Sequence, residues 1–223
     1  MRNLNENSEN NPMHSITFIS TVHKQIGKCS ADELCEILKK ITPEVVFLEA
    51  LEDTYSKYQQ HTFSNFGVFH EKLEISAIQK YRSISQFEYV PVLGKGLADS
   101  FEKKFNLLCQ NIHFQKMLDN FNSLACMKGF DFLNSEESII LHKEMSTYGD
   151  SILIDKELSR TFNSDIDKYE NSMISNIYSF CMNTKFKNAV FMCGVAHRKS
   201  VIDKIETYKS KKSLDISWKI YGQ

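Results

Sequence analysis

Short apolar segments alternate with amphipathic ones along this chain. Ser15–Val22 (SITFISTV) and Val45–Leu48 are rich in β-branched and aromatic residues and too short for buried helices, so both are predicted to be buried strands. Between them, Ser30-Ala-Asp-Glu33 has the form of a capping box, and apolar residues at helical spacing follow it until Pro43. A strand, a helix and a strand within about 35 residues predict a βαβ unit with parallel strands.

The rest of the chain continues this alternation, with a long helical stretch in its middle. Tyr89–Leu93 and Ala189–Cys193 are predicted as further strands, and the period of two in Leu214–Tyr221 indicates a half-exposed strand at a sheet edge. Helical patterns cover Phe66–Arg82, Ala98–Lys128 with one break, Ser135–Met145, Asp165–Met182 and the segment around Val201–Tyr208. The prediction is an α/β fold with a mixed, mostly parallel sheet flanked by helices, in which the helical segment 52–150 acts as a cap.

Composition narrows the class of protein. The 223 residues suit a single α/β domain over 14–223, preceded by a tail at 1–13 that is rich in Asn, Glu and Ser and is predicted to be disordered. A net charge of −1 and the lack of a long apolar run argue against nucleic-acid and membrane partners. The six cysteines form no C-x-x-C pair, which indicates free, buried thiols and a cytoplasmic location.

Polar residues of a catalytic type follow three of the predicted strands. His23 follows the first strand, Glu49 follows the second, and His197 follows the late strand after Gly194. In a parallel sheet all carboxyl ends lie at one edge, where ligands of open α/β sheets bind. Two imidazoles and a carboxylate could hold a divalent metal such as Mn, Co or Zn, which would activate a bound water. Each residue alone is also compatible with a structural role, so the prediction depends on their meeting in one pocket.

Other candidate residues are weaker. His70 and Glu74 lie at i, i+4 and favour a surface ion pair, although they could line the pocket as auxiliary groups. Gly94-Lys95-Gly96 follows a strand and could touch a phosphate, but it lacks the P-loop frame and is better explained as a flexible turn. His142 lies in a helical run whose default interpretation is a solvated face.

The stretches ISTVH, PEVVFLE and NAVFMCGVAH carry a resemblance to a known superfamily. They resemble the opening and closing motifs of TraB/Tiki/GumN proteins, with ChaN-like and erythromycin-esterase-like proteins as more distant relatives. The resemblance covers the first ~50 and last ~60 residues and implies a metal-dependent, peptidase-like hydrolase. It also implies that Asn171, in the late helix YENSMISNIYSF, supports the site by holding Glu49 or His197.

Two departures from the motifs leave alternatives open. Ser20 replaces the usual glycine, and Glu170 replaces a usual arginine, for which Lys168 or Arg160 could substitute. The leading hypothesis is a metal-dependent hydrolase of amide or ester bonds, acting on a small molecule or a peptide. One alternative is a metal-independent His/Glu hydrolase of the erythromycin-esterase type. Another is a non-catalytic binding or regulatory module on the same fold, and the last strand could pair with a second copy of the chain.

Overall fold

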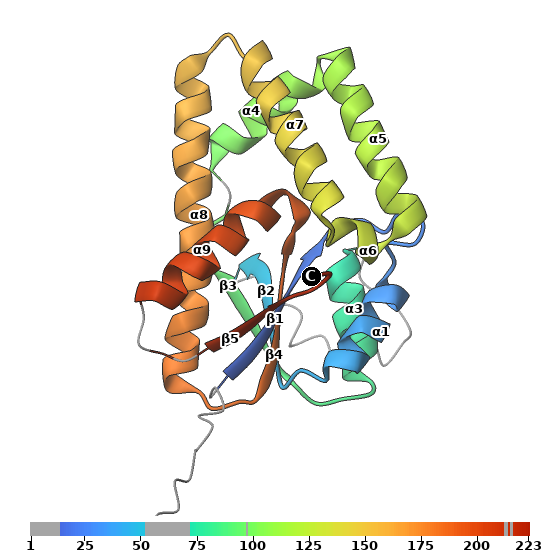
Figure 1. The fold of residues 1–223 in the computed structure, drawn as a ribbon, viewed down its shortest axis with the longest axis vertical. Helices are drawn as coiled ribbons and strands as arrows, with labels where there is room; N and C mark the ends of the chain where they lie inside the picture. Colours follow the sequence, from blue (N-terminus) through green and yellow to red (C-terminus); the bar gives the residue numbers. More distant parts are fainter. Residues whose placement is uncertain (1–13, 52–71, 97, 212–213, 215) are drawn as a thin grey trace, which may run out of the picture.

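The computed structural model describes residues 14–51, 72–96, 98–211, 214 and 216–223. These residues form a five-stranded sheet in the order β3-β2-β4-β1-β5, and every strand pair is parallel (Figure 1). The strands are β1 (His14–Thr21), β2 (Val45–Leu51), β3 (Glu88–Leu93), β4 (Asn188–Gly194) and β5 (Ile216–Ile220). The predicted α/β fold is confirmed, but the sheet is wholly parallel in the described residues instead of mixed. β5 lies at the edge, as its alternating pattern predicts.

The predicted βαβ unit is formed by β1, α1 (Ala31–Ile41) and β2. Ser30 caps α1, since its Oγ accepts a hydrogen bond from the Glu33 amide at 3.1 Å. The helix ends at Thr42, which adopts a left-handed φ of 50° and donates its N–H to Leu38. In a capping box the glutamate side chain accepts from the backbone amide of the capping serine. Here the Glu33 carboxylate instead accepts from the backbone amide of Phe130 at 3.4 Å.

Helices cover both faces of the sheet (Figure 1). One face packs against α1 and α3 (Leu73–Arg82), and the other packs against α8 (Lys156–Asn183) and α9 (Arg198–Lys211). Alternation along β1 explains this arrangement, since Ile19 belongs to the first core while Ile16 and Phe18 belong to the second. The sheet is therefore buried on both sides, as parallel sheets generally are.

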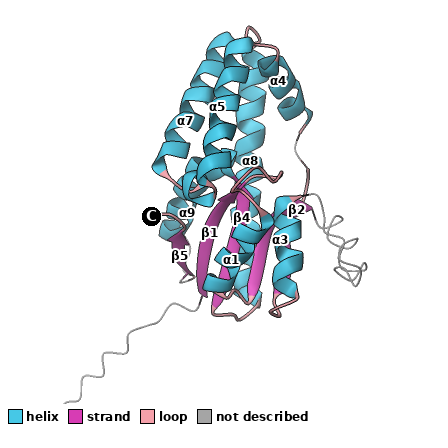
Figure 2. Ribbon diagram, turned by 90° about the vertical axis from the view of Figure 1, so that its right-hand side faces the viewer, coloured by secondary structure: helices cyan, strands magenta, loops and turns pink. Residues whose placement is uncertain are grey.

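A helical lobe extends beyond the carboxyl ends of the strands (Figures 1 and 2). It consists of the first part of α8 together with α4 (Asp99–Cys109), α5 (Ile112–Lys128), α6 (Phe130–Leu133) and α7 (Glu136–Ile152). The 28 residues of α8 run from the lobe down one face of the sheet. No helix in the described residues is both long enough and apolar enough to cross a membrane.

Some element boundaries differ from those predicted. The predicted break within Ala98–Lys128 falls at Asn111, whose side chain accepts from the amides of His113 and Phe114. α8 begins nine residues before the predicted Asp165, because Asp155 provides an N-terminal cap. The helix predicted from Phe66 is described only from Leu73, and the predicted tail at 1–13 lies outside the described residues.

All six cysteines lie in the described residues and all are free thiols. Cys29, Cys35, Cys181 and Cys193 are buried, which agrees with the apolar stretches around them. The prediction of burial is wrong for Cys126, which is exposed on α5. It lies in the last turn of α5, where its neighbours Met127 and Lys128 are exposed as well.

Candidate active site

The three predicted site residues meet around Gly194, at the carboxyl end of β4. β4 pairs with β1 on one side and with β2 on the other, so their ends are neighbours. A β-carbon placed on Gly194 would lie 3.3 Å from Glu49 Oε2 and 3.8 Å from His23 Nε2. It would also lie 3.8 Å from His197 Cδ2. The structure therefore brings His23, Glu49 and His197 around one small space, and their chemical role stays a prediction.

A buried carboxylate from α3 orients His23. The Nδ1 atom of the ring lies 3.0 Å from Glu74 Oε1, and the Thr21 hydroxyl donates to the same oxygen at 2.7 Å. Glu74 is 3% exposed, whereas the side chain of His23 is 57% exposed. Because Nδ1 is engaged, the opposite nitrogen, Nε2, faces the space beside Gly194. His23 is thus an oriented imidazole that water can reach.

A second buried carboxylate holds His197 in the same way. Glu170 of α8 is 2% exposed, and its Oε1 lies 2.8 Å from His197 Nδ1. Its other oxygen accepts a hydrogen bond from the Ser200 hydroxyl and lies 3.2 Å from Lys204 Nζ. His197 belongs to the short helix η1 (Val195–His197) and is itself buried. The site therefore contains two histidine–glutamate pairs, one open to solvent and one enclosed.

Glu49 is fixed between the two pairs. Its Oε1 accepts from the Tyr169 hydroxyl at 2.7 Å, and its Oε2 accepts from the Gly194 amide at 2.6 Å. The Nε2 atom of His197 lies 3.6 Å from the first of these oxygens. The carboxylate is therefore held from both sides by hydrogen-bond donors and faces an imidazole.

The carboxylates shift the pKa values of the histidines upward. The hydrogen bond to Glu74 raises the pKa of His23 above its ordinary value. Burial lowers the pKa of His197, but its bond to Glu170 and the charge of Glu49 outweigh burial and raise the pKa overall. Burial would raise the pKa of Glu49, yet the charge of His197 and the amide of Gly194 bring it below its ordinary value. Glu49 thus stays ionised at a pH where the imidazoles can exchange protons.

A buried arginine ties the strand end behind the site to the lobe. Arg198 is 1% exposed and donates from Nη1 to Ser20 Oγ at 3.2 Å and to Asn134 Oδ1 at 2.9 Å. Its Nη2 donates to the backbone oxygens of Asn134 at 2.6 Å and Tyr221 at 2.9 Å. Burial lowers the pKa of Arg198 to about 10. Ser20, which departs from the motif glycine, thus supplies an acceptor that glycine would lack.

Asn171 does not join the site. Its side-chain amide donates to the backbone oxygen of Asp167 at 2.8 Å and to the Asp167 carboxylate at 3.1 Å. Asn171 therefore bonds to the preceding turn of its own helix. The preceding residue, Glu170, supplies the support for His197 that the resemblance assigned to Asn171. The cation nearest to Glu170 is Lys204, and neither Lys168 nor Arg160, whose side chains are 75% and 81% exposed, takes that place.

Three polar residues of the site were missed or misassigned from sequence. Glu74 is buried, so it is not the surface residue that its spacing from His70 favoured; it takes the alternative position, as an auxiliary group of the site, and His70 lies outside the described residues. A carboxylate between Leu73 and Ile75, on a helix otherwise apolar on that side, was the available signal. Tyr169 and Glu170 precede Asn171 directly, but helical spacing alone does not tell which of the three faces the sheet.

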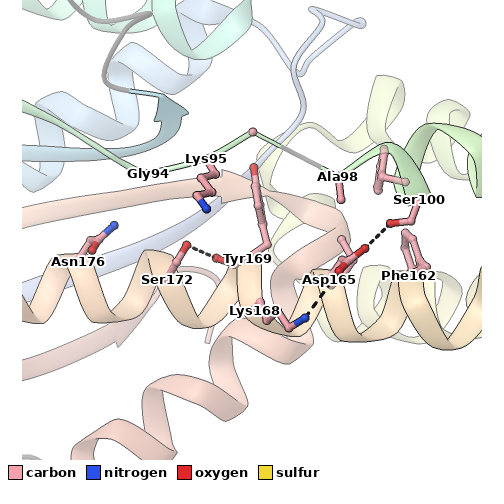
Figure 3. Close-up of a pocket in the computed structure, with 13 residues that line it drawn as sticks. Gly94, Lys95, Ala98, Ser100, Phe162, Asp165, Lys168, Tyr169, Ser172 and Asn176 are labelled. Atoms are coloured by element: carbon pink, nitrogen blue, oxygen red, sulfur yellow. Dashed lines mark hydrogen bonds and ion pairs between the residues drawn. The ribbon is translucent and has the colours of Figure 1, made fainter.

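A cavity of about 540 Å³ adjoins the site on the side of β3 (Figure 3). It lies between the turn at residues 94–96, the start of α4 and one face of α8. Tyr169 belongs both to its lining and to the site, because its hydroxyl reaches Glu49. The Gly94-Lys95-Gly96 turn therefore lines a cavity and is not merely a surface connection.

His142 also differs from its expected solvated position. It is half-buried on α7, with its ring 5.3 Å from that of Phe121. Burial lowers its pKa to about 4, so the ring is neutral near neutral pH. Its neighbours Lys143 and Glu144 are exposed, as a solvated helix face predicts.

The donor set was tested against a divalent metal. Each histidine has a carboxylate at Nδ1, which is the usual arrangement around a metal ligand, but Nε2 of His197 already lies 3.6 Å from Glu49 Oε1. However, both oxygens of Glu49 already accept hydrogen bonds from Tyr169 and Gly194. Across residues 14–51, 72–96 and 98–211, no group of three His, Cys, Asp or Glu side chains is arranged to hold a metal ion. The residues as placed do not fit the metal centre, whose presence remains a prediction.

Comparisons with known proteins do not identify a family for this chain. No protein-family model matches the chain. No curated protein matches it. Among solved structures, an erythromycin esterase mutant in its open conformation is similar with a TM-score of 0.26 and 11% identity. The match covers 92% of this chain and 60% of that one, so the chain spans about three fifths of its length. The resemblance to TraB/Tiki/GumN proteins thus stays a prediction.

Proposed function

We propose that the protein is a metal-independent hydrolase of ester or amide bonds that uses two histidine–glutamate pairs. The observation that carries the proposal is the meeting of the two pairs beside Gly194, where the ring edge opposite Nδ1 of each histidine lies toward the same space. A histidine held by a carboxylate is the usual general acid–base unit of hydrolases. Both pairs lie at the carboxyl edge of the parallel sheet, which is where open α/β folds bind their ligands.

His23 is assigned the role of general base. It is the more exposed ring and has a single carboxylate partner, so its Nε2 can take a proton from a water molecule. The water oxygen then forms a bond to the carbonyl carbon of the substrate, and the π electrons of the carbonyl bond move to the carbonyl oxygen. The resulting tetrahedral species collapses with cleavage of the bond to the leaving oxygen or nitrogen.

His197 is assigned the role of general acid. It lies between Glu170 and Glu49, and these two negative charges favour its protonated form. Its Nε2–H would deliver a proton to the leaving group as the bond breaks, which balances the proton taken by His23. Glu49, held by Tyr169, would keep this imidazolium in position and stabilise its charge.

Hydrolysis of p-nitrophenyl butyrate and of its anilide tests the proposal directly. Wild-type protein should release nitrophenol or nitroaniline above the rate in buffer, and His23→Asn or His197→Asn should lower kcat/KM by about 100-fold or more. His113→Asn is the matched control, because His113 is exposed on α5 and lies outside the site. A wild-type rate that both site substitutions leave intact would contradict the assignment.

The same assay separates the two alternatives. Activity that EDTA abolishes and Mn, Co or Zn restores would favour the metal-dependent hydrolase and overturn the metal-independent one. A biological function that survives His23→Ala combined with His197→Ala, in a folded protein, would favour a binding or regulatory module. Indifference to EDTA, together with loss of activity in both single variants, is the result that we expect.

A further inference from the structure

The cavity beside the site is separated from the reacting groups by one side chain. Tyr169 projects from α8 between the cavity and the strand ends (Figure 3), and its hydroxyl lies 2.7 Å from Glu49. On its other side its ring lies 5.6 Å from that of His197. A molecule seated in the cavity would therefore have one end next to the two histidine–glutamate pairs.

Most of the cavity wall is apolar. Phe101 of α4 and Phe162 of α8 stack with ring centroids 5.8 Å apart, and Ala98 and Ile166 continue the same wall. The volume of about 540 Å³ falls within the range of pockets that enclose small organic ligands. The wall thus suits an alkyl or aryl group rather than a sugar or a peptide backbone.

Within the described part of the chain, one positive charge in the lining has no carboxylate beside it. Lys168 lies 4.0 Å from Asp165, which is also bound by the Ser100 hydroxyl at 2.7 Å, so these two charges offset each other. Lys95 projects from the turn toward α8 (Figure 3) and has no carboxylate partner among the residues that the structure describes. The lining therefore carries a net charge of about +1 near neutral pH.

We infer that the cavity binds a substrate with an apolar body and a single carboxylate, and that Lys95 determines this specificity. An ammonium group beside an apolar wall favours an anion over the neutral molecule of the same shape. One uncompensated positive charge matches a monocarboxylate better than a phosphate, which carries more charge. The inference rests on the proposed function for the statement that the ligand is a substrate, whereas the binding itself is independent of catalysis.

Calorimetric titration with 4-phenylbutyrate and 4-phenylbutanamide tests the inference, because the two probes share a shape and differ in charge. Wild-type protein should bind the carboxylate about tenfold more tightly than the amide, and Lys95→Gln should remove that difference. Lys103→Gln is the control, since Lys103 is exposed on α4 outside the cavity.

Equal affinity for the two probes in wild-type protein would overturn the inference. A preference that persists in Lys95→Gln would overturn it as well. If the preference exists and depends on Lys95 while no ester or amide is hydrolysed, the inference about binding is supported and the proposed hydrolase function is contradicted. The two ideas can therefore be rejected separately.

Discussion

At the scale of single residues, the histidines are defined by their carboxylates. Glu74 and Glu170 are almost fully buried, and each accepts from a hydroxyl as well as from an imidazole. A buried carboxylate of this kind fixes the tautomer and the direction of its ring. These two residues therefore decide whether His23 and His197 can act together.

Replacing Glu74 by glutamine should change the pH profile of hydrolysis. Glu74 raises the pKa of His23 above 6.5. The wild-type rate should therefore decline as the pH falls through this raised pKa, because the base becomes protonated. Without the carboxylate the pKa falls, and this acid limb should move to lower pH while kcat drops by about 10-fold to 100-fold. The measurement is kcat/KM against pH for both proteins. A limb at the same pH in both would show that Glu74 does not act on the catalytic base.

Adding one methyl group at Gly194 should disturb the site without disturbing the fold. The backbone there has a φ of −56°, which alanine tolerates, but its β-carbon would lie 3.3 Å from Glu49 Oε2. The carboxylate must shift by a few tenths of an ångström, so we expect Gly194→Ala to lose about tenfold in kcat/KM with little change in melting temperature. Ser179→Ala is the control, because Ser179 is exposed on α8 and lies outside both the site and the cavity. Equal loss in both variants would contradict the explanation.

The sequence allows His23, Glu49 and His197 to be predicted because each lies at or shortly after the carboxyl end of an apolar strand. Parallel pairing then places all three at one edge. Their partners cannot be predicted in this way, since Glu74 and Glu170 lie within helices and reach the site through helix orientation. Asn171 was chosen one position too late along α8, and one position turns a side chain by about 100° around the helix.

At the scale of elements, the strand ends are held by a clamp built on Arg198. Four hydrogen bonds from its guanidinium join β1, the start of α7 and the end of β5. None of these acceptors is a carboxylate, so the arginine acts through geometry and not through an ion pair. Arg198 directly follows His197 in the sequence, so the clamp fixes where η1 leaves the sheet.

Removing this clamp should cost a substantial part of the stability. In Arg198→Met the buried oxygens of Asn134 and Tyr221 lose their donors, and we expect the free energy of unfolding to fall by about 2 to 4 kcal/mol. Urea unfolding at pH 7 measures the change. Arg160→Met, at an exposed position on α8, should stay within about 0.5 kcal/mol of wild type. A similarly small effect of Arg198→Met would mean that water satisfies these oxygens.

Strands and helix starts were predictable where local chemistry decides them. Ser30 caps α1 as its motif predicts, and the buried strands β1, β2 and β4 stand out as apolar runs. The lengths of α7 and α8 were underestimated because their lobe halves carry mixed polar residues. Those halves are helical through packing against other helices of the lobe, α7 against α5 and α8 against α4, which no periodicity within either segment reveals.

At the scale of the whole molecule, α8 joins the lobe to the sheet. Its second half packs against β3 and places Ile174 and Ile177 in the same buried cluster as residues of β1, β2 and β4, and its first half packs in the lobe through Phe162. The same helix presents Tyr169 and Glu170 at the point where the two halves meet. The site therefore requires the lobe and the sheet to be folded together.

A substitution that removes contacts only in the lobe should then lower the stability of the sheet as much as it lowers the stability of the lobe. Lys104 is a suitable position, because it is 5% exposed, lies 2.8 Å from Asp150 and sits over the Phe162 ring at 4.1 Å. Lys104→Met keeps most of the volume but leaves the Asp150 carboxylate without its cation, which should cost about 1 to 3 kcal/mol.

Two probes show whether the loss is shared. Trp218, the single tryptophan, is buried on β5 and reports on the sheet through its fluorescence, while far-ultraviolet circular dichroism reports mainly on helices, many of them in the lobe. Thermal transitions by the two signals should coincide in wild type and shift together in Lys104→Met, since coincident probes indicate cooperative unfolding. If circular dichroism melts first while Trp218 keeps its wild-type midpoint, the lobe unfolds independently. In that case α8 would not couple the lobe to the strand ends, and the site could lose Tyr169 and Glu170 while the sheet stays intact.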